Sequence, residues 1–251
     1  VTGVQTCALP IYGKNTLYDE SFMQRFDSHF IIQDGLIEPV GKFLGWVYVM
    51  LNPGRWICRN DWEFHAMILI NYLSVKFPAA LVNLVNIQGA NTGKTALHFA
   101  VDQGFPSIVN ALLKITGIDI NRRDYNGETP LHRSFMPGCP VSIPILLIWH
   151  GADVRITDNK NFTPLNMALL FWKNDWFVPM ILDYFPDYDI HSRDHEGFDM
   201  LRWAVECKRP VLVKKLLEMG GDVNSEDDRG ISTKNSIWAR DNKEISKLLN
   251  I

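Results

Sequence analysis

The stretch that decides the fold begins at Gly127 and reads GETPLHRS. Related octets begin at three other positions: GKTALHFA at Gly93, NFTPLNMA at Asn161 and GFDMLRWA at Gly197. These starts are 34, 34 and 36 residues apart, and a weaker copy, GISTKNSI, begins 33 residues later at Gly230. Self-similarity at one period over five units predicts a repeat architecture rather than one central core.

The octet contains the signals that begin a helix. Thr129 stands where an N-cap side chain accepts a backbone N–H, and Pro130 follows at the first helical position, which needs no N–H. Gly127 allows the unusual backbone of a tight turn before the cap. Leu131 and Ser134 are three residues apart and therefore lie on one face of the helix.

A second helical pattern with two adjacent aliphatic residues follows each of the first four octets. These pairs are Leu112–Leu113, Leu146–Leu147, Ile181–Leu182 and Leu216–Leu217. A short turn signal comes next: GIDIN, GADVR, DYDIH or GGDVN. Each unit is thus predicted to be turn, helix, loop and helix. One such unit cannot bury its own apolar face, so the units are expected to stack into a solenoid.

This pattern resembles the ankyrin repeat, whose period is about 33 residues and whose signature is T-P-L-H-x-A. The resemblance implies an all-α solenoid of helix–turn–helix units with protruding β-hairpin-like turns. The expected units span about 90–123, 124–157, 158–193, 194–226 and 227–251, the last being a cap. The signature residues are Gly93, Thr95, Leu97, His98, Gly127, Thr129, Pro130, Leu131, His132, Thr163, Pro164, Leu165, Gly197 and Leu201. The resemblance implies a structural role for the two histidines, which would hydrogen-bond within and between repeats.

Some units depart from this signature. Asn166 and Arg202 stand where the first two units have histidine. Asp199 and Met200 replace the Thr-Pro pair in the fourth unit, and the third unit is longer and rich in aromatic residues. The fifth unit has Lys234 in place of the leucine, and a polar last unit suits a cap whose outer face meets water.

The chain before the repeats is less regular. Residues 1–11, VTGVQTCALPI, resemble a translated sequencing-library adapter, so we expect them to be non-native; the alternative is a natural, poorly ordered tail. Residues 12–61 are expected to form an irregular or helical cap, or to be the remnant of another domain. Residues 62–89 contain two apolar patterns, at 62–72 and 78–86, and are expected to form a degenerate repeat or cap. The chain is then expected to be a fragment.

Composition excludes several classes of protein. The 251 residues are 47% hydrophobic and 21% charged, with a net charge of −3, which argues against a disordered chain or a strongly basic nucleic-acid-binding protein. The four cysteines form no C-x-x-C pair, so a reducing, intracellular and cytoplasmic location is expected. The longest apolar stretch, residues 64–87, contains charged and amide side chains, and no membrane span is expected.

Three motifs suggest chemistry but have simpler explanations. Residues 89–95, GANTGKT, are one residue short of a phosphate-binding loop and no hydrophobic strand precedes them. His191 and His195 have helical metal-ligand spacing but fall on an expected turn. Cys139 and Cys207 are expected to be packing residues. We therefore expect no catalytic residue, no cofactor and no metal site.

The expected function is a non-catalytic, monomeric protein–protein interaction scaffold. Tyr125, Phe162 and Phe198 are expected to stand in a row on three neighbouring turn tips, where exposed aromatic side chains suit a partner; alternatively, each ring folds back onto the next turn. The expected partner-binding residues are Tyr125, Asn126, Glu128, Lys160, Phe162, His195, Glu196, Phe198 and Arg229 on the turns, and Met136 and Leu170 on the first helices. Two rival functions are the targeting or regulatory part of a larger enzyme whose catalytic domain is missing, and a purely structural solenoid.

Overall fold

The computed structural model describes residues 31–33, 36–38, 67, 70–71, 73–75, 78–172 and 174–251. The chain divides into two compact units, Val1–Phe43 and Leu44–Ile251. In the first unit, β1 (Ile31–Gln33) and β2 (Leu36–Glu38) form an antiparallel hairpin, which the sequence pattern does not predict. The expectations for residues 1–11 and for most of 12–77 lie outside the described residues.

In the second unit, helices come in pairs. The first helices of the pairs are α5 (Ala96–Asp102), α7 (Pro130–Arg133), α9 (Pro164–Phe171), α11 (Met200–Glu206) and α13 (Ile237–Asp241). The second helices are α6 (Pro106–Leu113), α8 (Ser142–Trp149), α10 (Phe177–Tyr184), α12 (Pro210–Glu218) and α14 (Lys243–Leu249). Before the pairs lies α4 (Pro78–Asn86), which coincides with the second apolar pattern of residues 62–89. A short 3-10 helix, η1 (Thr233–Asn235), precedes α13.

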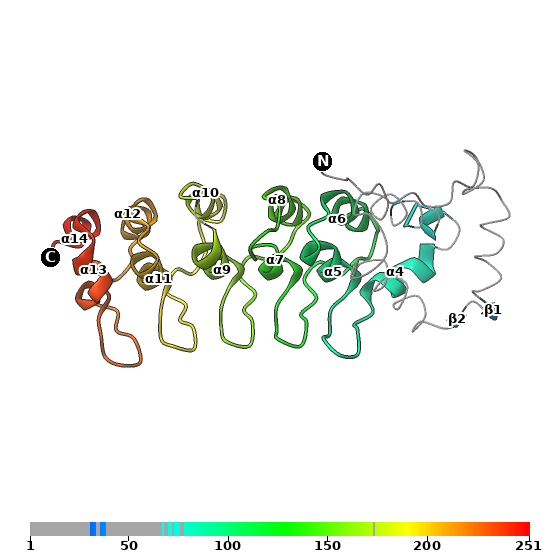
Figure 1. Cartoon of the computed structure of the whole chain (residues 1–251), viewed down its shortest axis with the longest axis horizontal. Helices are drawn as coiled ribbons and strands as arrows, with labels where there is room; N and C mark the ends of the chain where they lie inside the picture. Colours follow the sequence, from blue (N-terminus) through cyan, green and yellow to red (C-terminus); the bar gives the residue numbers. More distant parts are fainter. Residues whose placement is uncertain are drawn as a thin grey trace, which may run out of the picture. The chain divides into compact units, whose positions relative to one another are not determined.

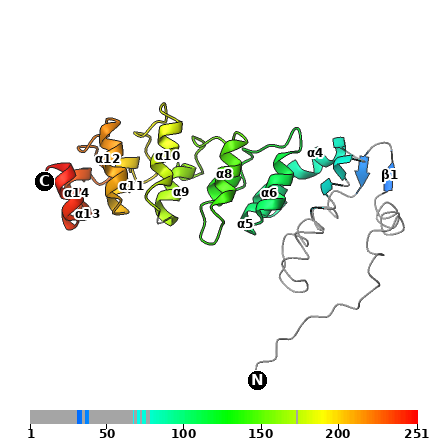
Figure 2. The ribbon, with the colours of Figure 1, turned by 90° about the horizontal axis from the view of Figure 1, so that it is seen from above.

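The helix pairs stack in one direction. Figure 1 shows the first helices in one row, the second helices in a row above them, and the connecting turns projecting below. Seen from above in Figure 2, the second helices lie side by side along the stack. We call the projecting turns fingers, and they comprise residues 87–95, 121–129, 155–163, 191–199 and 224–232. The predicted solenoid of paired helices is confirmed, and its fingers contain one isolated β-bridge, between Glu226 and Ser232.

The caps explain where the first helices begin. The hydroxyl of Thr129 accepts the N–H of His132, and Thr163 caps α9 in the same way. In the fourth repeat, a carboxylate replaces the hydroxyl: Asp199 Oδ1 accepts the N–H of Arg202 at 2.8 Å. The departure from Thr-Pro at this position therefore preserves the cap.

The core lies between the helix rows. Leucines of the octets are buried at 0–1% exposure, as are the small residues three positions later. The leucines are Leu97, Leu131, Leu165 and Leu201, and the small residues are Ala100, Ser134, Ala168 and Ala204. The Ser134 hydroxyl donates to the carbonyl of Leu131 at 2.7 Å, so its polar atom is satisfied inside the core. The expected burial of Leu131 is confirmed.

The fingers are joined by main-chain hydrogen bonds. Tyr125 N donates to Thr92 O at 3.0 Å, and equivalent bonds link the later fingers in sequence. An aspartate shapes each of the last four fingers: Asp124 Oδ1, for example, accepts the N–H groups of Asn126 and Glu128. Its counterparts are Asp158, Asp194 and Asp227.

Glycine is required in the fingers for two separate reasons. Gly127 has φ +79°, and a Cβ placed on it would lie 2.7 Å from the backbone nitrogen of Asn159 in the next finger. We expect Gly127→Ala to lower the free energy of unfolding by about 2–3 kcal/mol, from left-handed strain together with the clash. Gly138 has φ +89° but no atom within 4 Å of such a Cβ. Gly138→Ala should therefore cost only about 1 kcal/mol in urea unfolding. Equal losses of unfolding free energy in the two variants would show that the close approach of Gly127 to the next finger contributes nothing.

Candidate functional site

The fingers and first helices together form the surface that we call the inner face. One position in it immediately precedes each helix cap and is occupied in turn by Lys94, Glu128, Phe162 and Phe198. Another lies at or just after the C-terminal end of the first helix and is occupied by Asp102, Met136, Leu170 and Glu206. The inner face thus changes from charged in the first two repeats to apolar in the third.

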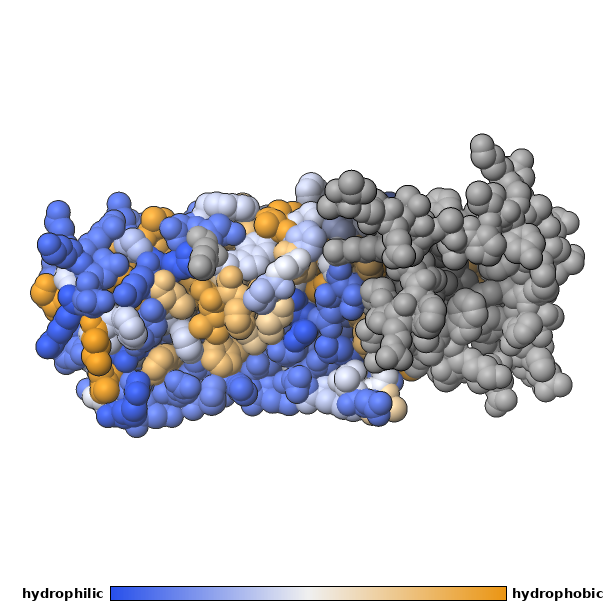
Figure 3. Space-filling view, viewed as in Figure 1, coloured by the Kyte–Doolittle hydropathy of each residue, from blue (hydrophilic) through white to orange (hydrophobic). Residues whose placement is uncertain are grey.

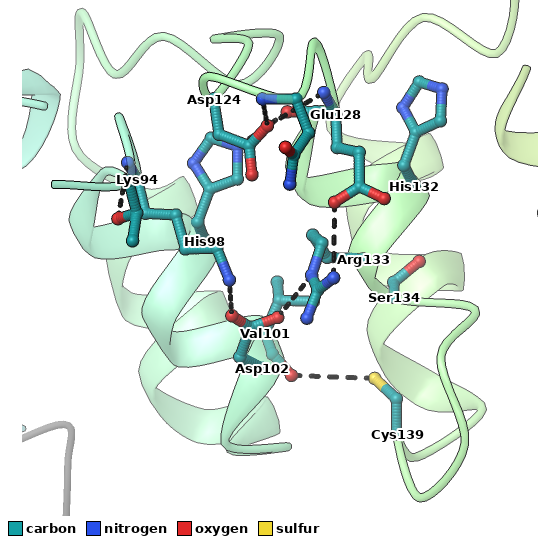
Figure 4. A network of polar contacts seen from close by, with 12 residues as sticks. Lys94, His98, Val101, Asp102, Asp124, Glu128, His132, Arg133, Ser134 and Cys139 are labelled. Carbon is teal, nitrogen blue, oxygen red and sulfur yellow. Dashed lines mark hydrogen bonds and ion pairs between the residues drawn. The ribbon is translucent and has the colours of Figure 1, made fainter. Parts of the chain in front are cut away.

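The charged part is a chain of ion pairs across two repeats (Figure 4). Lys94 Nζ lies 2.6 Å from Asp102 Oδ2, and Arg133 Nε lies 2.7 Å from Asp102 Oδ1. Arg133 also pairs with Glu128 at 3.2 Å. Burial raises the pKa of Glu128, and the Arg133 charge opposes that rise. These four side chains pair with one another, so their two positive and two negative charges balance.

In each of the first two repeats, one histidine fastens the first helix to the next finger. His98 Nδ1 accepts the backbone N–H of Thr95 at 3.2 Å, and its Nε2 donates to the carbonyl of Glu128 at 3.1 Å. His132 makes the equivalent contacts with Thr129 and with the carbonyl of Phe162. Because Nδ1 accepts a hydrogen bond, the ring must be neutral with its proton on Nε2. Both rings are therefore structural.

These rings make stability depend on pH below neutrality. Burial lowers the pKa of His98 and His132 from the usual 6.5. The unfolded chain then takes up protons at a higher pH than the folded chain, so the stability contribution is complete above 6.5 and is lost as the pH falls toward the folded pKa. We expect urea unfolding to show lower stability at about pH 5.5 than at about pH 7.5.

The control for this pH effect is the double variant His98→Asn, His132→Asn, which uses the residue that the third repeat has naturally. Its stability should vary less over the same pH range because asparagine does not titrate there. An unchanged pH dependence in the double variant would assign the effect to other groups.

In the third repeat, Asn166 stands in place of the histidine, and a tyrosine of the same repeat binds the helix cap. Asn166 hydrogen-bonds to Thr163 within its own repeat. Tyr188, from the segment after α10, donates its hydroxyl to Thr163 Oγ1 at 2.7 Å. Burial raises the pKa of Tyr188 to about 12, so the hydroxyl keeps the proton that it donates. The repeat pattern does not single out Tyr188; its signal in the sequence is a bulky residue where neighbouring repeats have Ala152 and Gly221.

The fourth repeat replaces the histidine by an arginine. Arg202 Nη1 donates to the carbonyl of Ser232 in the next finger at 3.1 Å, the same kind of contact that the histidines make. Its other nitrogens pair with Asp227 at 3.3 Å and with Glu206 at 2.9 Å. The guanidinium also lies over the ring of Phe198, 4.9 Å from the ring centroid. Arg202 is thus a buried link between the last two repeats.

The expected row of exposed aromatic residues is wrong at two of its three positions. Phe162 is only 8% exposed and Phe198 only 6%, because both rings pack against Trp203 with centroids 5.5 and 5.2 Å away. Trp203 is held by its Nε1, which donates to Asp194 at 2.7 Å. The expectation of an outward Glu128 is also wrong, because the position before the cap is buried at the base of the finger and faces the first helices.

The other expected finger residues are accessible. Tyr125 is 59% exposed, and its ring edge rests on Gly93 of the preceding finger. The other finger residues expected to bind a partner are also exposed: Asn126, Lys160, His195, Glu196 and Arg229. Their role in binding stays a prediction.

The middle of the inner face presents apolar side chains. Leu170 is 37% exposed and Met136 is half-buried, and their role in binding stays a prediction. Phe171, 42% exposed, is the last residue of α9, and Trp176, 51% exposed, immediately precedes α10; the sequence pattern assigns neither to a partner surface. Figure 3 shows apolar side chains gathered in the middle of the stack, over α7 and α9. We call these four residues the inner apolar patch.

Cys139 and Cys207 are both partly buried. Burial raises the pKa of the Cys139 thiol to about 12, and the charge of Asp102 adds to this; the pKa of Cys207 is also raised by burial. Neither thiol is therefore a ready nucleophile. In the described part of the chain, no three His, Cys, Asp or Glu side chains are placed to hold a metal. No helix there is long and apolar enough to span a membrane.

Comparison with known families agrees with this geometry. Residues 66–147 match a family model described as ankyrin repeats, in three copies. The match covers α4 through most of the second helix pair, and the same caps and helix pairs continue to α14. No curated protein matches the chain significantly. Ankyrin repeats generally serve as protein–protein interaction modules, and no catalytic domain is identified beside them.

Proposed function

The chain contains ankyrin repeats in residues 66–147, and from that premise we propose that it is a non-catalytic scaffold whose inner face binds a partner protein. The observation that carries the proposal is the inner apolar patch of Met136, Leu170, Phe171 and Trp176. Exposed apolar side chains grouped on one surface are typical of interfaces. Aromatic residues among them are the usual energetic anchors.

The surroundings of the patch support an interface. On one side lies the ion-pair chain of Asp102 and Arg133, and on the other lies Glu206, paired with Arg202. Paired charges around an apolar centre form the polar rim that interfaces usually have. The accessible finger tips, including Tyr125 and Lys160, extend the same surface and would contribute orientation more than affinity.

The test is a matched pair of variants in a binding experiment. A partner captured by the wild-type chain should bind a Leu170→Ala, Phe171→Ala variant about 10–100-fold more weakly, if the two side chains act as anchors. Val211, on the outer side of α12 and half exposed, provides the control. Val211→Ala should leave the affinity unchanged. Thermal unfolding should show that both variants are folded. Equal partner affinity of the two folded variants would contradict the proposal.

A further inference from the structure

The row of second helices has an unusually apolar centre. α8 reads SIPILLIW and contains no charged residue, and α10 contains only Asp183. Their neighbours present polar groups outward: Lys114 follows α6, and Lys214 and Glu218 lie on α12. A surface helix normally has a polar outer side, and a helix apolar all round is normally covered. α8 and α10 are therefore exceptional within their own stack.

A groove separates these two helices. α8 and α10 contact each other less than the other neighbouring second helices do. The groove has a volume of about 620 Å³, and Ile145, Met180 and Ile181 contribute apolar lining. Trp149 and Tyr184 also line it and are 84% and 74% exposed. Large aromatic side chains so exposed at one site indicate a contact surface.

One end of the groove attracts positive charge. α8 and α10 are equivalent helices of successive repeats, so their C-terminal ends, which carry partial negative charge, lie at the same end. Neither helix has a basic residue in its last turn, whereas α12 has Lys215. Residues 183–189, DYFPDYD, add three carboxylates and no cation. Lys215 pairs with Asp183 and Arg155 with Asp187, which leaves the region net acidic.

We propose that this outer groove is a second docking site, independent of the inner face, for a partner segment that is apolar and ends in a basic residue. Apolar side chains of the segment occupy the space between Ile145 and Met180. The basic side chain lies against Trp149 and Tyr184, where ring faces and helix carbonyl ends both favour a cation. Each groove helix has 8 residues, which matches about two turns of a bound helix.

The experiment selects peptides rather than a natural partner. A displayed library of helical peptides is selected on the whole chain and counter-selected on the Ile145→Asp, Met180→Asp variant. We expect enriched peptides to share apolar residues at helical spacing, followed by Lys or Arg. A synthetic copy of such a peptide should bind at least about tenfold more weakly to Trp149→Ala, while Val211→Ala should bind normally. Replacing its terminal Lys or Arg by Glu should weaken binding similarly.

Several outcomes would overturn the proposal. Selected peptides without a basic end, or peptides that bind the groove variants normally, would exclude this chemistry. Self-association of the chain that Ile145→Asp abolishes would assign the groove to a second copy. Should the double aspartate variant fail to fold, Trp149→Ala, Tyr184→Ala replaces it, because both side chains are mostly exposed and contribute little to the core. If no peptide remains after counter-selection against this second variant, the proposal is also overturned.

Discussion

Leu131→Ala is expected to lower the free energy of unfolding by about 2–5 kcal/mol. Leu131 is fully buried between the helix rows, in the second repeat of the stack. The loss combines the transfer energy of the deleted atoms with the cavity that they leave, and tightly packed neighbours such as Leu97 and Leu165 limit collapse of that cavity. Urea unfolding monitored by circular dichroism measures it.

Which repeats lose stability in Leu131→Ala is as informative as how much free energy of unfolding is lost. Each repeat contacts only its neighbours, so hydrogen exchange should speed up first in α5, α7 and α9 and the helices paired with them. Leu170→Ala is the control, because this leucine belongs to the same helix row but is partly exposed. It should cost less than about 1 kcal/mol. Wild-type unfolding of Leu131→Ala would show that the repeats do not share this core.

Arg202→Met is expected to cost about 3–5 kcal/mol, the usual result of removing one partner from a buried ion pair. The Arg202 side chain is nearly buried, and it holds both Asp227 and the carbonyl of Ser232. Burial alone would raise the pKa of Asp227, but the N–H groups of Ile231 and Arg229 and the Arg229 charge lower it, so the carboxylate stays charged. Methionine fills the volume and leaves that charge less compensated.

The matched control binds the same carboxylate from solvent. Arg229 Nη2 lies 3.0 Å from Asp227 Oδ2, but its side chain is two-thirds exposed. Arg229→Met should therefore cost about 1 kcal/mol or less. Similar losses for the two variants would show that burial of Arg202 does not decide its contribution. Hydrogen exchange in α11 to α14 measures the local stability of the last two repeats and distinguishes the two variants.

The stack itself could be predicted because its determinants are local and repeated. Helix starts follow from Thr-Pro caps, and the burial of Leu131 follows from periodic spacing. Even the irregular segment before the repeats contains α4 at the expected residues 78–86. Repetition averages out local ambiguity, because five similar segments must satisfy the same packing.

The orientation of single side chains was harder to predict. Lys94 and Glu128 are charged, which favours an exposed position before the cap, and by analogy the pattern predicts outward rings for Phe162 and Phe198. In the fold this position faces the first helices, so its charges need partners and its aromatic rings are buried. Trp203, which receives both rings, lies in the same repeat as Phe198 but one repeat and 41 residues after Phe162, a distance that a local pattern does not reveal.

The hydrogen bonds of His98 and His132 have a consequence for how such a gene can change. Each ring donates to a main-chain carbonyl of the following repeat, a group that every amino acid supplies. The receiving side of the junction therefore does not depend on which residue stands there. A recombination event that removes residues 124–157 in frame would bring His98 opposite the carbonyl of Phe162, the acceptor that His132 now uses. We expect such a shortened chain to fold, so repeat number can vary between descendants without redesign of each new junction.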